Sequence, residues 1–89
     1  MYRLRVWNNQ KLLPTHFDKI TWADVILVTN YDKNNITGYI GGNTLMEMGV
    51  AFFLNKPIYL LNQIPDMSYK EEVLGMKPVV IDGNFGLIK

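Results

Sequence analysis

Glu47 and the two glycines before it are the residues whose types and spacing best suit chemistry. Gly41 and Gly42 come directly before a predicted helix, so their unhindered amides and the positive helix end suit a phosphate or carboxylate. Glu47 follows about one helical turn later, where a carboxylate can attack an anomeric carbon and form a covalent sugar intermediate. A structural role also fits, because Thr44 and Glu47 have the spacing of a capping box.

The polar segment before those glycines holds further candidates. It is a loop of about a dozen residues between Thr29 and Gly42, and loops of such length in small domains are often functional. Asn30 and Asp32 are ordinary turn formers that also face the predicted crevice. Tyr39 is either a packing residue or a platform for a stacked base.

His16 is the only histidine of the chain. It has no second ligand at a familiar metal spacing, so we expect a helix-start residue and no metal site.

These residues must be positioned by alternating strands and helices. The run Asp24–Val28 is typical of a strand buried on both faces of a parallel sheet. Asn43 or Thr44 is predicted to cap the helix that contains Glu47. The remaining expected elements are a weak edge strand within residues 1–10, a short helix over about 16–22, a helix over about 44–54, a strand over 58–61, a helix from 68 to 75 and a strand over 78–81 before an Asp82-Gly83 turn.

Three details refine the expected helices. Ser68 and Glu71 have capping-box spacing at the start of the third helix. Along the second helix, Leu45, Met48, Ala51 and Phe52 are predicted to form the inward face. Gly49 lies inside that helix and predicts a close approach of another backbone or of a ligand.

This alternation predicts one α/β domain over residues 1–89, a Rossmann-like (flavodoxin-like) three-layer sandwich with a small parallel sheet. In such sheets the ligand crevice lies beyond the carboxyl ends of the strands, where the glycine-bearing loop is expected. A domain of this size is marginal alone, so we expect a homodimer or higher homo-oligomer.

Composition narrows the partners and the compartment. A net charge of +1 without a basic run disfavours nucleic acid and anionic membranes as partners. The chain has no cysteine, which excludes disulfides and thiolate chemistry and suits a reducing cytosol. Its longest mainly apolar stretch is far shorter than a membrane span, and residues 1–13 lack the apolar core of a signal peptide. We therefore expect a cytoplasmic protein.

Three segments, taken in their order along the chain, resemble a known family. They are Ala23-Asp24-Val25-Ile26-Leu27-Val28, then Tyr39-Ile40-Gly41-Gly42-Asn43-Thr44-Leu45-Met46-Glu47-Met48-Gly49-Val50-Ala51, then Asn55-Lys56-Pro57-Ile58. In this order they resemble the nucleoside 2-deoxyribosyltransferase-like superfamily, which includes the deoxynucleoside monophosphate N-glycosidases. The resemblance covers about residues 15–81.

The resemblance implies roles for individual residues. Glu47 matches the family's nucleophile, which attacks C1′ of the sugar, releases the base and leaves a glycosyl-enzyme for water or another base to resolve. Gly41 and Gly42 match the loop at the sugar 5′-hydroxyl or 5′-phosphate, and Asn43 and Thr44 are neighbouring candidates. No metal or redox cofactor is implied.

Two departures from the family pattern stand out. His16 occupies the position at which the family has an aspartate that helps to protonate or orient the leaving base. Family members also begin with a strand and a long helix that wall the nucleotide pocket, so this chain is expected to be a member shortened at the N-terminus. Either residues 1–13 replace that wall, a partner subunit supplies it, or the chain binds without catalysing.

The leading hypothesis is therefore a transferase or N-glycosidase acting on a nucleoside or nucleotide, with Glu47 and His16 as catalytic residues. The alternative is a non-catalytic nucleotide-binding or oligomeric interaction module on the same scaffold. A phosphoacceptor domain of the response-regulator type shares the sheet but requires an acidic cluster at the first strand, which is missing here.

Overall fold

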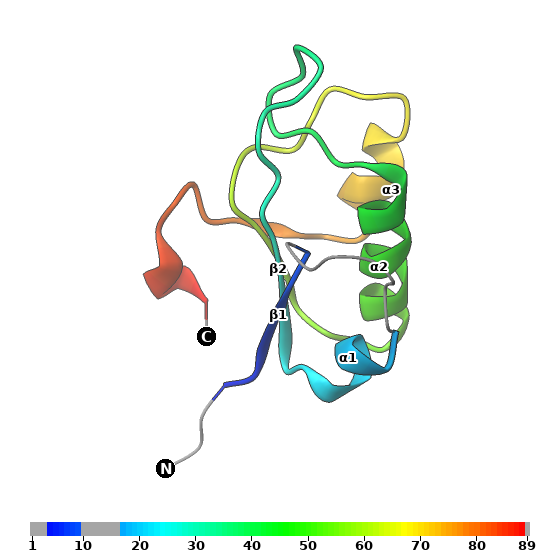
Figure 1. The fold of residues 1–89 in the computed structure, drawn as a ribbon, viewed down its shortest axis with the longest axis vertical. Coiled ribbons are helices and arrows are strands. Elements are labelled where there is room, and N and C mark those ends of the chain that lie inside the picture. The colour runs from blue at the N-terminus through cyan, green and yellow to red at the C-terminus, as the bar shows by residue number, and fades with distance from the viewer. Residues whose placement is uncertain (1–3, 10–16, 89) are drawn as a thin grey trace.

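The protein folds as a small parallel sheet with helices, as a computed structural model shows for residues 4–9 and 17–88 (Figure 1). Its elements in chain order are β1 (Val6–Asn8), α1 (Phe17–Trp22), β2 (Val25–Val28), α2 (Gly42–Phe53), β3 (Ile58–Leu60), α3 (Lys70–Gly75), β4 (Val79–Val80) and the 3₁₀ helix η1 (Phe85–Leu87). The alternation predicted from the sequence is confirmed over the described residues.

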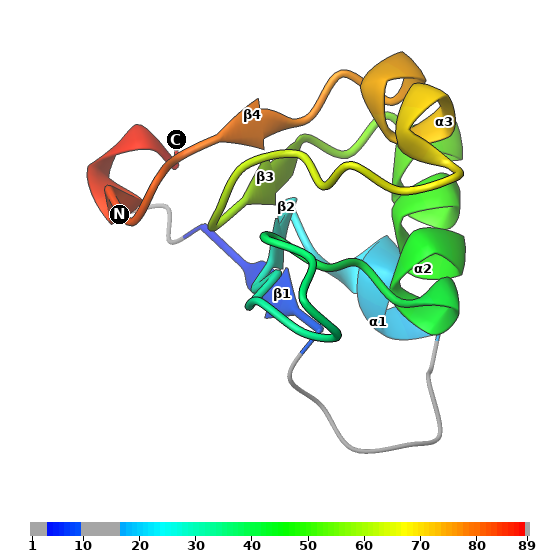
Figure 2. The same cartoon turned by 90° about the horizontal axis from the view of Figure 1, so that it is seen from above.

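The four strands stand in the sheet in the same order as in the sequence. The order is β1-β2-β3-β4, and each neighbouring pair is parallel. The crossover helices α1, α2 and α3 all lie on one face, while η1 lies on the other (Figure 2). Crossovers of one hand in a sequential sheet produce this one-sided arrangement. The α/β class with a small parallel sheet is confirmed. The Rossmann-like specifics are not, since a three-layer sandwich has α-helices on both faces and the described ones cover only one.

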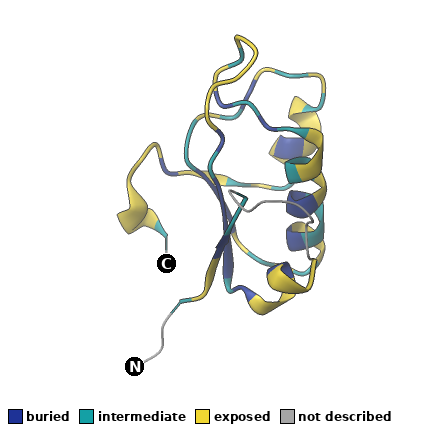
Figure 3. Ribbon diagram, viewed as in Figure 1, coloured by how far each residue is buried: buried dark blue, intermediate teal, exposed yellow. Residues whose placement is uncertain are grey.

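Strand β2 is the best buried part of the sheet, as Figure 3 shows. All four of its residues are buried. Ile26 and Val28 join the core beneath the helices, whereas Val25 and Leu27 face a second cluster on the opposite side. An uninterrupted apolar run is what a strand covered on both faces requires.

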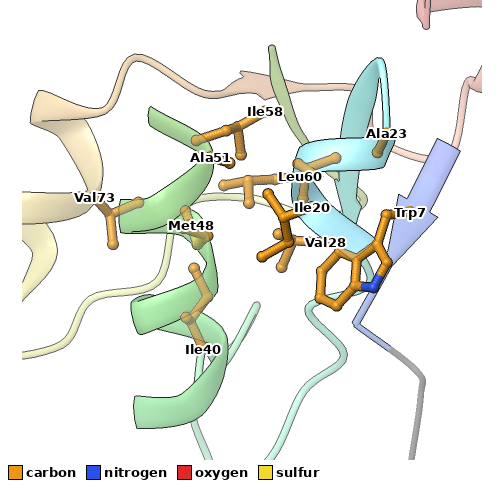
Figure 4. Packing of buried hydrophobic residues seen from close by; sticks show 11 residues of the cluster. Trp7, Ile20, Ala23, Val28, Ile40, Met48, Ala51, Ile58, Leu60 and Val73 are labelled. Atoms are coloured by element: carbon orange, nitrogen blue, oxygen red, sulfur yellow. The ribbon is translucent and has the colours of Figure 1, made fainter. Parts of the chain in front are cut away.

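The larger core lies between the sheet and the helices (Figure 4). Ile20 of α1, Met48 of α2 and Leu60 of β3 have no exposed surface. The other buried members are Trp7, Ala23, Ile26, Val28, Ile40, Ala51, Ile58 and Val73. This core fixes α2, and with it Glu47, relative to the strand ends.

Strand β1 is an edge strand, as predicted, and Trp7 is its inward residue. Trp7 is 5% exposed, whereas Val6 is 39% exposed. The side chains of a strand alternate between the two faces. Trp7 therefore reaches the helix-covered face, and Leu4 and Val6 lie on the thinly covered one.

The predicted helix caps are wrong at two places. The N-cap of α2 is Gly41 rather than Asn43 or Thr44, and that of α3 is Tyr69 rather than Ser68. Neither helix start has a side-chain cap hydrogen bond. Both helices therefore begin through backbone geometry, which residue spacing alone does not reveal.

The carboxyl end of α2 is closed by the Asn55-Lys56-Pro57 turn, as predicted. Asn55 has a φ of 59°, and the Lys56 amide donates to the carbonyl oxygen of Ala51 at 2.9 Å. These are the left-handed residue and the long backbone bond of a Schellman motif.

The outer face of α2 differs from the prediction in two respects. Phe52 is 48% exposed instead of inward, and Glu47 is buried in the helix instead. A Cβ added at Gly49 would meet nothing within 4 Å. The close approach predicted for this glycine is therefore not made by the described residues of this chain.

Candidate functional site

A polar pocket opens beyond the carboxyl ends of β1 and β2, beside the start of α2. Its volume is about 340 Å³. It is lined by Asn9, Thr29, Tyr31, Asp32, Lys33, Tyr39, Gly41 and Thr44. The pocket lies where parallel sheets generally hold ligands, and it brings together the predicted residues Asp32, Tyr39, Gly41 and Thr44.

Asn9 joins the three elements around this pocket. Its Oδ1 accepts hydrogen bonds from the Thr29 amide at 2.7 Å and from the Thr29 hydroxyl at 2.8 Å. Its Nδ2 donates to Oγ1 of Thr44 at 3.4 Å. The end of β1, the end of β2 and the first turn of α2 are thereby held together. Sequence reasoning missed Asn9, whose signal is a polar residue directly after an edge strand.

Asn30 serves the scaffold of the loop instead of lining the pocket. The residue is 1% exposed. Its Nδ2 lies within hydrogen-bonding distance of the carbonyl oxygens of Gly38 (3.2 Å), Asn62 (3.1 Å) and Gln63 (3.0 Å), and its Oδ1 accepts from the Asn62 amide at 2.8 Å. In return, Nδ2 of Asn62 donates a hydrogen bond to the Asn30 carbonyl oxygen at 3.0 Å. This reciprocal pair, the Asn30–Asn62 clamp, ties the loop after β2 to the loop after β3.

Gly38 fits under that clamp because it has no side chain. Its φ is +71°, and an added Cβ would lie 2.2 Å from the carbonyl oxygen of Gln63. The Gly38 amide donates to Oδ1 of Asp32 at 3.0 Å. Asp32 therefore both lines the pocket and holds the loop.

The charged and aromatic wall of the pocket comes from the tip of the same loop. Lys33 and Ile36 exchange backbone hydrogen bonds of 3.1 and 2.9 Å around Asn34 and Asn35, both with positive φ. The turn places Nζ of Lys33 5.7 Å from the ring centre of Tyr39, a cation–π contact. Lys33 thus brings a positive charge to a pocket that also holds the Asp32 carboxylate.

Tyr69 interacts with the end of the loop after β2 and with Tyr39. The Tyr69 hydroxyl donates a hydrogen bond to the Ile40 carbonyl. Burial, and secondarily the neighbouring Tyr39 phenol, raises the pKa of Tyr69 above its ordinary value of 10.0. Tyr69 therefore stays protonated at neutral pH and anchors the residue just before Gly41.

The start of α2 leaves its glycines with open space. A Cβ at Gly41 would lie 3.6 Å from the Tyr39 ring, and one at Gly42 would meet nothing within 4 Å. Gly41 lines the pocket, whereas the predicted site residues Gly42 and Asn43 are exposed outside its lining. Free backbone amides at a helix start suit an anion.

Glu47 lies one turn farther along α2 than Thr44, about 4.5 Å along the helix axis. It is 6% exposed and is not among the residues that line the pocket. Glu47 is not an isolated charge, since the protein provides it with an interaction. The other predicted catalytic residue, His16, lies outside the described residues.

No metal-binding cluster among the described residues marks this site. Residues 4–9 and 17–88 contain no cluster of three or more side chains able to hold a metal ion. Over the same ranges, no helix has the length and apolar character to cross a membrane. Comparison with protein-family models, with curated proteins and with solved structures found no match to this chain.

Proposed function

We propose that the protein cleaves or transfers the N-glycosidic bond of a nucleoside or nucleotide, with Glu47 as the nucleophile. The observation that carries the proposal is a buried carboxylate one helical turn from a polar pocket at the strand ends. The resemblance of the segments around Asp24, Glu47 and Lys56 to the nucleoside 2-deoxyribosyltransferase-like superfamily selects this chemistry among those open to a carboxylate.

In the proposed reaction a carboxylate oxygen of Glu47 attacks C1′ of the sugar. The C1′–N bond breaks, and its electron pair leaves with the base, which takes up a proton. His16, at the position of the family's aspartate, is the proposed proton donor. Water then hydrolyses the glycosyl ester, or a second base displaces Glu47.

The pocket provides groups for the rest of the substrate. The Gly41 amide and the charge of Lys33 suit the 5′-hydroxyl or 5′-phosphate side, and the exposed Gly42 amide lies just outside the lining. The ring of Tyr39 offers a stacking surface beside them. Because Glu47 is buried, little water screens its charge from a sugar that reaches it.

The alternative is a nucleotide-binding module without catalysis. The observation that favours it is that Glu47 lies outside the pocket lining and has an interaction within the protein. In that case Glu47 stabilises the helix–sheet packing, and the pocket alone holds the ligand.

Chromatographic detection of free base tests the proposal. The native chain is incubated with a panel of deoxynucleosides and their 5′-monophosphates, alongside Glu47→Gln and the matched control Glu72→Gln, which alters an exposed carboxylate of α3. We expect base release by the native chain and the control, and a loss of at least about 10³-fold for Glu47→Gln.

Calorimetric titration of the same nucleotides separates the two functions. Binding without base release, equal in the native chain and in folded Glu47→Gln, would establish the binding module and remove the catalytic proposal. Base release that survives Glu47→Gln would assign the chemistry to another residue.

A further inference from the structure

A second pocket of different character lies on the outer side of the helices. Its volume is about 530 Å³, and it lies between α1 and α2. We call it the α1–α2 groove, and it is lined by Phe17, Thr21, Met46, Gly49, Val50, Phe53 and Leu54. None of these side chains is charged, so the groove has no side chain that could pair with a phosphate.

The groove exposes large apolar side chains to water. Phe53 is 83% exposed, Met46 58% and Phe17 43%. Since a large apolar side chain presents roughly 200 Å², these three leave about 350 Å² in water. An apolar area of this size is comparable to the largest patch on a typical monomer, roughly 300–600 Å², and such patches are often functional.

The spacing along α2 makes this surface complementary to itself. Met46, Gly49 and Phe53 follow one another at intervals of three and four residues, and Val50 lies beside them. An antiparallel copy of α2 would place Phe53 against Met46 and Val50 against Gly49, on both sides of a two-fold axis. Each copy then uses the same residues in the contact as its partner does, which is the condition for an isologous dimer.

Gly49 supplies independent support for a close helix contact. Interior glycine weakens a helix relative to alanine, yet an alanine Cβ would meet nothing within 4 Å here. The described residues of this chain therefore do not require glycine at position 49. A second backbone packed closely across this point would require a residue without a side chain.

Charge and area favour a second copy over a different partner. Glu47 is the only charged residue of α2 and is buried, so the helix offers a charged partner nothing to pair with. A stable interface buries about 800 Å² per partner, and homodimer interfaces are about 65% apolar. The apolar part of such an interface is about 520 Å² per partner, and the roughly 350 Å² exposed by Phe53, Met46 and Phe17 supplies about two-thirds of it.

We propose that the α1–α2 groove is the contact surface of a homodimer in which two α2 helices cross antiparallel near Gly49 and Val50. This dimer is independent of the glycosidic chemistry. It gives the oligomer expected from the size of the chain a defined surface on the described residues.

Sedimentation equilibrium from micromolar to millimolar concentrations tests the dimer. Phe53→Lys places a charge in the centre of the contact, and Phe85→Lys is its matched control, because Phe85 is 57% exposed on η1 across the sheet. We expect a dimer for the native chain and the control, and a dissociation constant raised at least about 30-fold by Phe53→Lys. Gly49→Ala should also weaken the dimer without lowering the stability of the monomer.

Disulfide trapping keeps the proposal testable if one variant folds poorly. The chain has no cysteine, so Val50→Cys introduces a single thiol beside the proposed axis, and Phe85→Cys introduces one away from it. Mild oxidation should link Val50→Cys chains rapidly and Phe85→Cys chains only at the rate of random collision. A native monomer at all concentrations, or a dimer indifferent to both Phe53→Lys and Gly49→Ala, would overturn the proposal.

Discussion

Two loops that leave the same edge of the sheet are stabilised in different ways. The segment 29–41 after β2 is held by the buried Asn30–Asn62 clamp, which reaches across to the loop after β3. The segment 82–88 after β4 is mostly exposed, and its side-chain bond is local, from the Gly86 amide to Oδ1 of Asn84 at 3.1 Å. Asparagine therefore serves as a buried tertiary connection in one loop and as a helix cap in the other.

The same contrast appears in the two glycines with positive φ. Gly38 has a φ of +71° and Gly83 one of +80°, but only Gly38 faces a carbonyl oxygen, that of Gln63, at a distance that excludes a Cβ. The first loop thus needs glycine for both conformation and space, and the second for conformation alone. The first loop carries most of the pocket wall, so its rigidity bears directly on ligand binding.

The largest expected effect comes from Gly38→Ala compared with Gly83→Ala. Left-handed alanine costs about 1 kcal/mol at either position, and at Gly38 the Gln63 carbonyl must also move out of a buried hydrogen bond. We expect a loss of unfolding free energy of about 4 kcal/mol for Gly38→Ala and about 1 kcal/mol for Gly83→Ala. Urea titration followed by tryptophan fluorescence measures both. Equal losses would show that the two loops do not differ in packing.

Asn30→Ala should have the next largest effect. It removes the side-chain half of the clamp and leaves the partly buried Asn62 amide without its acceptor, at a cost of about 3 kcal/mol. Asn43→Ala is the control, because Asn43 is exposed and should change stability by less than about 0.5 kcal/mol. If the two variants unfold at the same urea concentration, the clamp does not stabilise the fold.

Tyr69→Phe sharpens the comparison through its dependence on pH. The loss of the hydrogen bond to Ile40 should cost about 1 kcal/mol at neutral pH. Because the folded pKa of Tyr69 lies above 10.0, the unfolded chain loses that proton first, and native stability should fall as pH rises above 10.0. Tyr69→Phe should lack this part of the fall, whereas the control Tyr31→Phe, at an exposed tyrosine, should retain it.

Asn84→Ala should have the smallest effect, a loss of about 0.5 kcal/mol. The exposed cap stabilises only the short η1 helix. Thermal unfolding of this variant next to Asn30→Ala compares an asparagine of each loop directly. A loss at Asn84 as large as that at Asn30 would mean that the C-terminal segment is as important to the fold as the clamp.

Strand β2 could be predicted because the apolar character of its own residues matches their burial. The run Val25–Val28 is apolar throughout and is buried throughout. The Asp82-Gly83 turn was likewise predictable, since both residues adopt the positive φ that this pair favours. Local preference and final structure agree at these places.

The site was predictable only in outline. Asp32, Tyr39, Gly41 and Thr44 line one pocket, because loops at the carboxyl ends of parallel strands converge. The inward turn of Asn30 depends on carbonyls contributed by residues 62 and 63, and no local pattern encodes that distance. Asn9 and Lys33 belong to the pocket for the same reason, since tertiary contacts bring them there.

The sequential strand order also bears on how the chain reaches this structure. Each strand pairs with the next one in the chain: Val6 lies opposite Val25, Ile26 opposite Ile58 and Tyr59 opposite Val79. Because neighbouring strands in the sheet are also consecutive in the sequence, the sequence separation between paired residues is small, and the contact order is low for a parallel sheet. Each βαβ unit is thus complete within one continuous stretch of chain, from β1 through to β4.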